Sequence, residues 1–134
     1  MSMTDAFANT SLDALLGSST LLGSTVWIGL LLANPNPDGT GVVEPGGGSY
    51  ARVAIVNDSG HWPAASGRVK THAANIVFPT ASADWGTVVA VGVFSALSGG
   101  VLKLYDVLNE ARIVKNGDGF DFVAGGPFAL KFFA

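Results

Sequence analysis

Few side chains in this sequence could take part in catalysis. The two histidines are His61 and His72, and the carboxylates that could join them are Asp58 and Asp84. Because a Ser-His-Asp set assembles only in the folded chain, the spacing of these residues leaves such chemistry open. A hydrolase hypothesis therefore requires that at least two of these four side chains meet in a pocket.

The short motifs that mark known catalytic sites are absent from the sequence. It contains no GxSxG, SxxK or HExxH pattern. The glycine run at 46–48 has neither the lysine nor the apolar helix start of a phosphate-binding loop. The chain also lacks cysteine, which removes disulfides, thiolate metal sites and cysteine nucleophiles. We therefore predict that the protein is not an enzyme and that it has no catalytic residues, cofactor or metal.

Two segments come nearest to a metal site. Asp58 and His61 could be zinc ligands, but a structural zinc ion needs four ligands, so we expect an ordinary loop histidine. Asn116, Asp118 and Asp121 space their oxygen atoms somewhat as a calcium loop does. The glutamate that completes an EF-hand is missing, and Asn-Gly followed by Asp-Gly is mainly a hairpin signature. Calcium at 116–121 stays open.

The tryptophans could form a platform for sugar rings. Trp27 lies in the most apolar segment and Trp85 at a strand entrance, so both are expected in the core. Trp62 is the best exposed candidate, although core packing is the favoured role for it too. The long Pro- and Gly-rich loop from Asn34 to Ser49 is either a solvated crossover or a contact loop. Trp62 and this loop would form the receptor face of the alternative function, a carbohydrate-binding module.

Composition favours association over solvation. Hydrophobic residues make up 49% of the 134 residues and charged residues only 13%, against about 25% charged in a typical soluble domain. Apolar surface should therefore remain exposed, and such surface commonly marks an association site. The net charge is −3, and no lysine or arginine precedes Arg52. Without a basic patch, we expect no nucleic-acid partner.

The sequence shows no signal for membrane insertion or secretion. The start, MSMTDAFANTS, lacks a positively charged region, so we expect no Sec-type signal peptide. The longest apolar run, from Val26 to Ala33, is far shorter than the roughly 20 residues that span a bilayer. We expect a protein made in the cytoplasm and without a membrane segment.

A short helix should open the chain. Thr4 can cap it, Asp5 suits its first turn, and Gly17 is a plausible stop. The apolar side chains that gather on one side of this helix are Phe7, Leu12, Leu15 and Leu16. A helix this short must dock on something to persist. It either packs against its own domain or reaches a neighbouring subunit.

The rest of the chain predicts strands. We expect them at 26–32, 50–57, 68–72, 75–78, 87–96, 101–108, 112–115, 120–124 and 127–133. Alternation in the second strand places Val53 and Ile55 inward and Arg52 outward, and Gly92 indicates a bulge or a close backbone approach. The predicted fold is all-β, a single domain over 1–134 with a helical arm at 4–17. Residues 24–134 should form a β-sandwich of jelly-roll or Greek-key type, with a barrel as second choice.

Several segments resemble, in order and approximate spacing, a family of small tailed-bacteriophage virion proteins usually described as phage tail fibre proteins. The segments are Tyr50-Ala51-Arg52, Ala74-Asn75-Ile76-Val77-Phe78-Pro79, Ala83-Asp84-Trp85-Gly86-Thr87-Val88, Gly92-Val93-Phe94 and Gly99-Gly100-Val101-Leu102. The resemblance extends from about Met3 to Leu108.

The resemblance implies a non-enzymatic building block of the virion, with no catalytic residues to assign. A tail-fibre or tail-appendage subunit is one reading, and a capsid decoration (cement) protein is the other. Either would associate with copies of itself and with tail or major capsid proteins through apolar surfaces. A host surface glycan would be a further partner if the loop at 34–49 contacts a receptor.

Overall fold

Strands dominate the structure, as the sequence predicts. A computed structural model describes residues 2–17 and 22–133. The elements in these residues are β1 (Ser2–Met3), α1 (Asp5–Gly17), β2 (Thr25–Leu31), β3 (Val53–Val56), β4 (Val69–Thr71), β5 (Ile76–Val77), β6 (Gly86–Phe94), β7 (Leu102–Val114), β8 (Asp121–Phe122) and β9 (Lys131–Phe133). The all-β class with a short N-terminal helix is confirmed. No helix in the described part of the chain is long and apolar enough to cross a membrane.

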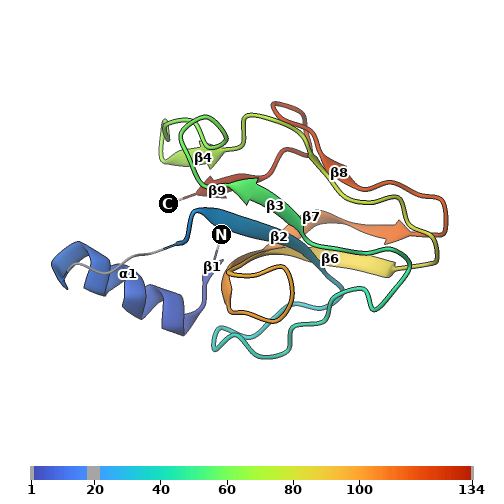
Figure 1. Ribbon diagram of the computed structural model, residues 1–134, viewed down its shortest axis with the longest axis horizontal. Helices are drawn as coiled ribbons and strands as arrows, with labels where there is room; N and C mark the ends of the chain where they lie inside the picture. Colours follow the sequence, from blue (N-terminus) through green and yellow to red (C-terminus); the bar gives the residue numbers. More distant parts are fainter. Residues whose placement is uncertain (1, 18–21, 134) are drawn as a thin grey trace.

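The main sheet has five antiparallel strands in the order β1-β7-β6-β2-β3 (Figure 1). β2 lies between β6 and β3, and most of its residues are buried. The apolar segment that the sequence predicts as a strand is therefore a central strand of the sheet.

Two short ribbons, β4-β9 and β5-β8, pair separately from the main sheet. Side chains from the sheet and from these ribbon segments form one buried cluster, which includes Val26, Ile28, Leu30, Ile76, Phe78, Val88, Val91, Val93, Phe120, Phe122 and Leu130. The second layer is therefore built of ribbons and connecting loops. The jelly-roll or Greek-key type and the single-domain division stay predictions.

Several predicted strands have other bounds in the structure. The segment at 112–115 is not a separate strand, because β7 continues through it to Val114 beside the start of β6. The last strand begins only at Lys131, because turns come before it: the N–H of Gly126 donates to Val123 O, and that of Ala129 to Gly126 O.

Gly92 marks a close approach, as predicted. It pairs directly with Gly29 across β6 and β2. A Cβ atom at Gly92 would lie 2.7 Å from Cδ1 of Leu102 and 2.9 Å from Cε2 of Phe94. Only glycine leaves room for these side chains, so the residue type follows from packing on this face of the sheet.

The prediction that Arg52 points to solvent is wrong, because this residue is only 9% exposed. Its Nε and Nη2 donate to the Glu44 carboxylate at 2.9 and 2.6 Å, and its guanidinium carbon lies 3.5 Å from the centre of the Phe94 ring. Strand alternation failed here because β3 begins only at Val53. Val53 and Ile55 do pack against the core, as predicted.

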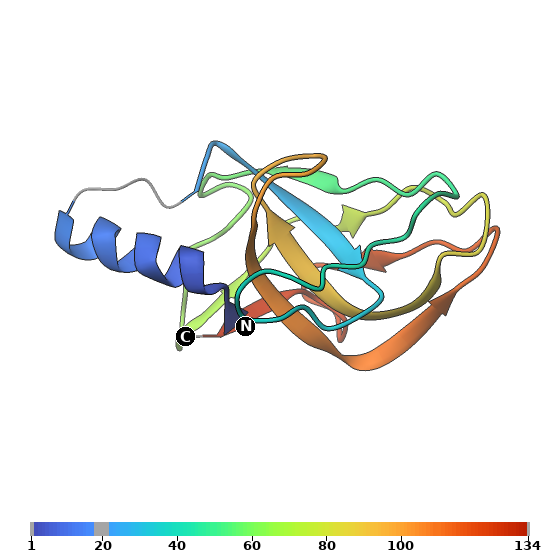
Figure 2. The ribbon, with the colours of Figure 1, turned by 90° about the horizontal axis from the view of Figure 1, so that it is seen from below.

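Helix α1 forms where the sequence places it, but Thr4 acts differently from the prediction. Its hydroxyl donates to Leu102 O at 2.9 Å on β7, while its carbonyl accepts the first helical bond from Ala8 N. Phe7 is buried, and the helix then projects away from the sheets (Figure 2). The three leucines of α1 stay exposed, with Leu12 at 59%, Leu15 at 78% and Leu16 at 90%.

Candidate functional site

Asp58 and His61 lie together because they belong to one turn. The Oδ1 atom of Asp58 is 2.7 Å from His61 Nδ1 and accepts the His61 backbone N–H at 2.9 Å. The hydrogen bond from the His61 side chain lowers the pKa of Asp58 below its ordinary value. Both side chains are about half exposed, at 52% for Asp58 and 45% for His61. The pair is thus an exposed turn cap.

The other two hydrolase candidates have separate structural roles. His72 is buried; its Nε2 accepts the Leu130 N–H at 3.0 Å, so the proton lies on Nδ1, 2.7 Å from Ala74 O. Asp84 accepts the backbone N–H of Asn116 at 2.8 Å. Two of the four residues therefore meet, and the remaining two do not join them.

The segment from Asn116 to Asp121 is the turn between β7 and β8. Asp118 Oδ2 accepts the backbone N–H of Lys115 at 2.9 Å, and Gly117 takes a φ of 91°, which favours glycine. Asp121 begins β8 and pairs with Val77. Across residues 2–17 and 22–133, no three His, Cys, Asp or Glu side chains are placed to hold a metal ion.

The tryptophan positions differ partly from the predictions. Trp85 is buried, as predicted, and its Nε1 donates to Gly48 O at 2.8 Å. Trp27 is only half-buried, whereas the sequence predicts it in the core. It packs against a second, smaller buried cluster, which contains Leu31 and Phe94. Trp62 is not the exposed platform that the sugar-binding hypothesis needs, because it is only 8% exposed. Its ring packs edge-on against Phe132 at 5.7 Å.

The loop at 34–49 does not lie beside Trp62. The loop connects the end of β2 to the start of β3, whereas Trp62 follows the end of β3. In an antiparallel pair these are opposite ends of the strands (Figure 1). The predicted receptor face made of Trp62 and this loop therefore does not form within one subunit.

The loop is held against the sheet by one buried polar cluster. Tyr50 donates from its hydroxyl to Glu44 Oε1 at 2.7 Å and accepts the Leu30 N–H at 2.9 Å. Arg52 adds bonds to the carbonyls of Ala96 and Gly99, at 2.7 and 2.8 Å. Burial and the hydrogen bond to Glu44 raise the pKa of the Tyr50 hydroxyl above its ordinary value. These polar groups stabilise loops rather than face a ligand.

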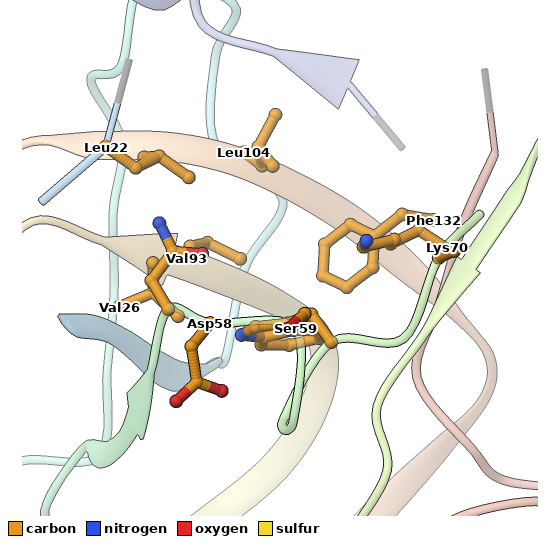
Figure 3. A pocket seen from close by; sticks show the side chains of 11 residues that line it. Leu22, Val26, Asp58, Ser59, Lys70, Val93, Leu104 and Phe132 are labelled. Atoms are coloured by element: carbon orange, nitrogen blue, oxygen red, sulfur yellow. The ribbon is translucent and has the colours of Figure 1, made fainter. Parts of the chain in front are cut away.

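An apolar groove of about 490 Å³ opens at the end of the core where β2 begins. Its apolar walls are Leu22, Val26, Trp62, Val93, Leu104 and Phe132. Figure 3 shows Leu22 and Leu104 on one side of this space and Phe132 beside Lys70 on another. Asn57, Asp58, Ser59 and Lys70 supply the polar rim. An open end of a hydrophobic core suits an apolar partner.

The groove contains one unpaired polar atom. Nε1 of Trp62 is buried and has no hydrogen-bond partner among the described residues. A buried N–H without an acceptor costs about 1–3 kcal/mol. Sequence reasoning missed this groove because its walls come from separate strands and loops, and no local pattern connects Leu22, Leu104 and Phe132.

The site thus combines exposed leucines, an apolar groove and polar groups that are hydrogen-bonded within the fold. No curated protein matches the chain. A family model described as Podophage GP4 fiber I protein gp80 matches residues 2–127, which is most of the chain. The resemblance to phage tail fibre proteins is thereby confirmed. The chain belongs to the Podophage GP4 fiber I protein gp80 family, a phage tail fibre family, and is a structural component of the virion.

Proposed function

We propose that this protein is a non-enzymatic subunit of a tail fibre or tail appendage that self-associates and binds other virion proteins through apolar surfaces. The observation that carries this proposal is the pairing of an exposed apolar helix with an apolar groove in one chain. The family description, which names a fibre, favours the tail over capsid decoration.

Other exposed apolar side chains support association. Those at least half exposed outside α1 are Val77, Leu97, Val107 and Ile113, at 61%, 52%, 53% and 65%. With charged residues at only 13% of the sequence, little charge is available to separate these side chains on the surface. Apolar area of this kind is covered when subunits assemble.

A non-enzymatic role agrees with the contacts of the polar groups. His72 is bonded to backbone through both ring nitrogens, and Arg52 is bonded to a carboxylate and two carbonyls. Asp84 and Asp118 accept backbone N–H groups at one turn. These contacts engage groups that catalysis would need free to act on a substrate.

Location and self-association test this proposal together. Light scattering over a range of concentrations should show an oligomer, and gold-labelled antibodies against the protein should mark the tails of intact particles. Label on the capsid shell would instead indicate a capsid decoration protein. A monomer at every concentration, together with unlabelled particles, would contradict the proposal.

The carbohydrate-binding alternative lacks its aromatic platform in this geometry. Trp62 is buried in the groove, at the opposite end of β3 from the loop at 34–49. A glycan array probed with the full chain addresses this alternative directly. Specific glycan binding that is lost when residues of the loop are changed would restore a receptor role.

A further inference from the structure

We propose that the distal end of α1 from one copy docks in the groove of a second copy. This inference deepens the proposed function, and rests on it, because it names the two surfaces through which subunits associate. In this contact, Leu12, Leu15 and Leu16 of one copy, which are exposed on α1, lie against the apolar walls of the groove of the other copy.

The apolar parts match in kind and in position. Leu12, Leu15 and Leu16 are spaced three and four residues apart, so they share one face of the helix. They lie in the half of α1 farthest from its anchor on β7, at the end of a helix roughly 20 Å long. The groove's apolar walls and its volume of about 490 Å³ can accommodate leucine side chains.

The polar parts of the two surfaces also complement each other. The last four carbonyls of a helix have no partner within the helix, and this end carries partial negative charge. α1 has no basic residue in its last turn, and it carries Asp13. The groove offers the amine of Lys70 at its rim. The incoming helix end would therefore lie beside a positive charge.

One acidic side chain also lies at the rim. Asp58 is bonded to His61, and its carboxylate is turned away from Leu104 and Phe132 (Figure 3). It therefore does not oppose the helix end at the apolar walls.

The arm is held so that it reaches outward rather than into its own groove. The Thr4 N–H donates to Lys103 O at 3.1 Å, and the Asp5 N–H donates to Pro37 O at 2.9 Å. Together with the Thr4 hydroxyl bond to β7, these contacts fix the first turn. Figure 2 shows the helix directed away from the sheets. Reversing it would break all three bonds, so a second copy is the occupant that the geometry favours.

Because the chain has no cysteine, single-cysteine variants of the full chain test this contact directly. Leu16→Cys and Ser59→Cys are prepared separately, mixed and mildly oxidised. We expect a cross-linked dimer that contains one chain of each variant, identified by intact mass. Ser59 is an exposed rim residue of the groove, so its change should not disturb the core.

Lys115→Cys is the matched control for the cross-link. Lys115 is exposed and directly follows β7, eleven residues beyond Leu104 of the groove, or about 35 Å along the strand. Mixed with Leu16→Cys, it should give at least tenfold less cross-linked dimer. Equal yields for the two pairs, or no cross-link with Ser59→Cys, would overturn the inference.

Charge placed on the arm gives a second, independent measurement. Leu15→Asp combined with Leu16→Asp should weaken self-association at least a hundredfold in sedimentation equilibrium, because both side chains would be buried in the partner. Ala6→Asp combined with Asn9→Asp adds the same charge to the anchored half of α1 and should leave association unchanged. An oligomer that survives the leucine changes would overturn the arm contact while leaving the proposed function standing. A wild type that remains monomeric would overturn the inference and the self-association in the proposed function, while the labelled particles would still test its place in the tail.

Discussion

Arg52 is buried with its guanidinium hydrogen-bonded to neighbours through all three nitrogens. It bonds the Glu44 carboxylate and two carbonyls of the β6–β7 connection, and it stacks on Phe94. Three segments separated in the sequence are thereby held together on one face of the sheet. Sequence periodicity predicts that Arg52 faces solvent, but its contacts instead hold these segments together.

Arg52→Ala should destabilise the fold strongly. The change leaves the Glu44 carboxylate, whose side chain is 20% exposed, without its cation. Removing one partner of a buried ion pair costs about 3–5 kcal/mol, and partial exposure of Glu44 places the expected loss at the lower end. Urea denaturation measures it, and Lys115→Ala, at an exposed site, should change the free energy of unfolding by less than about 0.5 kcal/mol. Equal losses in the free energy of unfolding for the two changes would contradict this structural role of Arg52.

The raised pKa of Tyr50 predicts that the folded state loses stability at alkaline pH. Its pKa is raised in the folded state, so the folded chain holds this proton more tightly than the unfolded chain does. The contribution is therefore complete below the unfolded pKa of about 10 and declines as pH rises above it. Thermal melts between pH 8 and pH 11 should show this decline.

Tyr50→Phe should melt at a lower temperature at pH 8, because the bonds to Glu44 and Leu30 are lost. It should also show a shallower decline above pH 10. Tyr105→Phe removes the other tyrosine hydroxyl of the chain and serves as the control. If the melting temperature falls equally above pH 10 in wild type and Tyr50→Phe, groups other than Tyr50 cause the loss of stability.

At the scale of the elements, the pairing of β2 with β6 depends on glycine. Gly29 and Gly92 face each other across the two strands, and side chains from three segments occupy the space above them. A Cβ at Gly29 would lie 2.8 Å from Glu44 Oε1 and from Phe94 Cε2. The same glycine pair thus admits both the aromatic ring and the polar cluster.

Gly92→Ala should destabilise the sheet by about 1–3 kcal/mol, because the added methyl group meets Leu102 and Phe94 below ordinary contact distance. Guanidinium denaturation checks the value. Gly119→Ala is the matched control, since no atom lies within 4 Å of a Cβ at that position. If Gly92→Ala is as stable as the control, the sheet tolerates the extra group and the packing argument is wrong.

At the scale of the whole molecule, association through apolar surfaces predicts weak dependence on salt. Charged contacts between exposed groups are screened at high ionic strength, where the Debye length falls to about 3 Å at 1 M. Contacts between apolar surfaces are not screened in this way. Oligomers of the wild type should therefore persist in 1 M sodium chloride when followed by light scattering. Dissociation into monomers at that concentration would indicate that ionic contacts hold the subunits together.

The fold class, most strand positions and the absence of catalytic motifs could be read from the amino-acid sequence alone. Alternating apolar residues and Gly- or Pro-rich turns are local signals, so strands such as β2 and β6, and helix α1, could be located from them. The segments with turn and strand residues from Tyr50 to Leu102 also carried the resemblance to phage fibre proteins that the family match confirms.

The positions of the chemically distinctive side chains became clear only from the folded chain. Trp62 and Arg52 are buried because residues from distant segments cover them, and no local pattern encodes such long-range packing. The groove has the same cause, since its walls come from strands and loops far apart in the sequence. The exposure of the leucines on α1 was likewise decided by how its first turn is anchored, which directs the helix away from its own core.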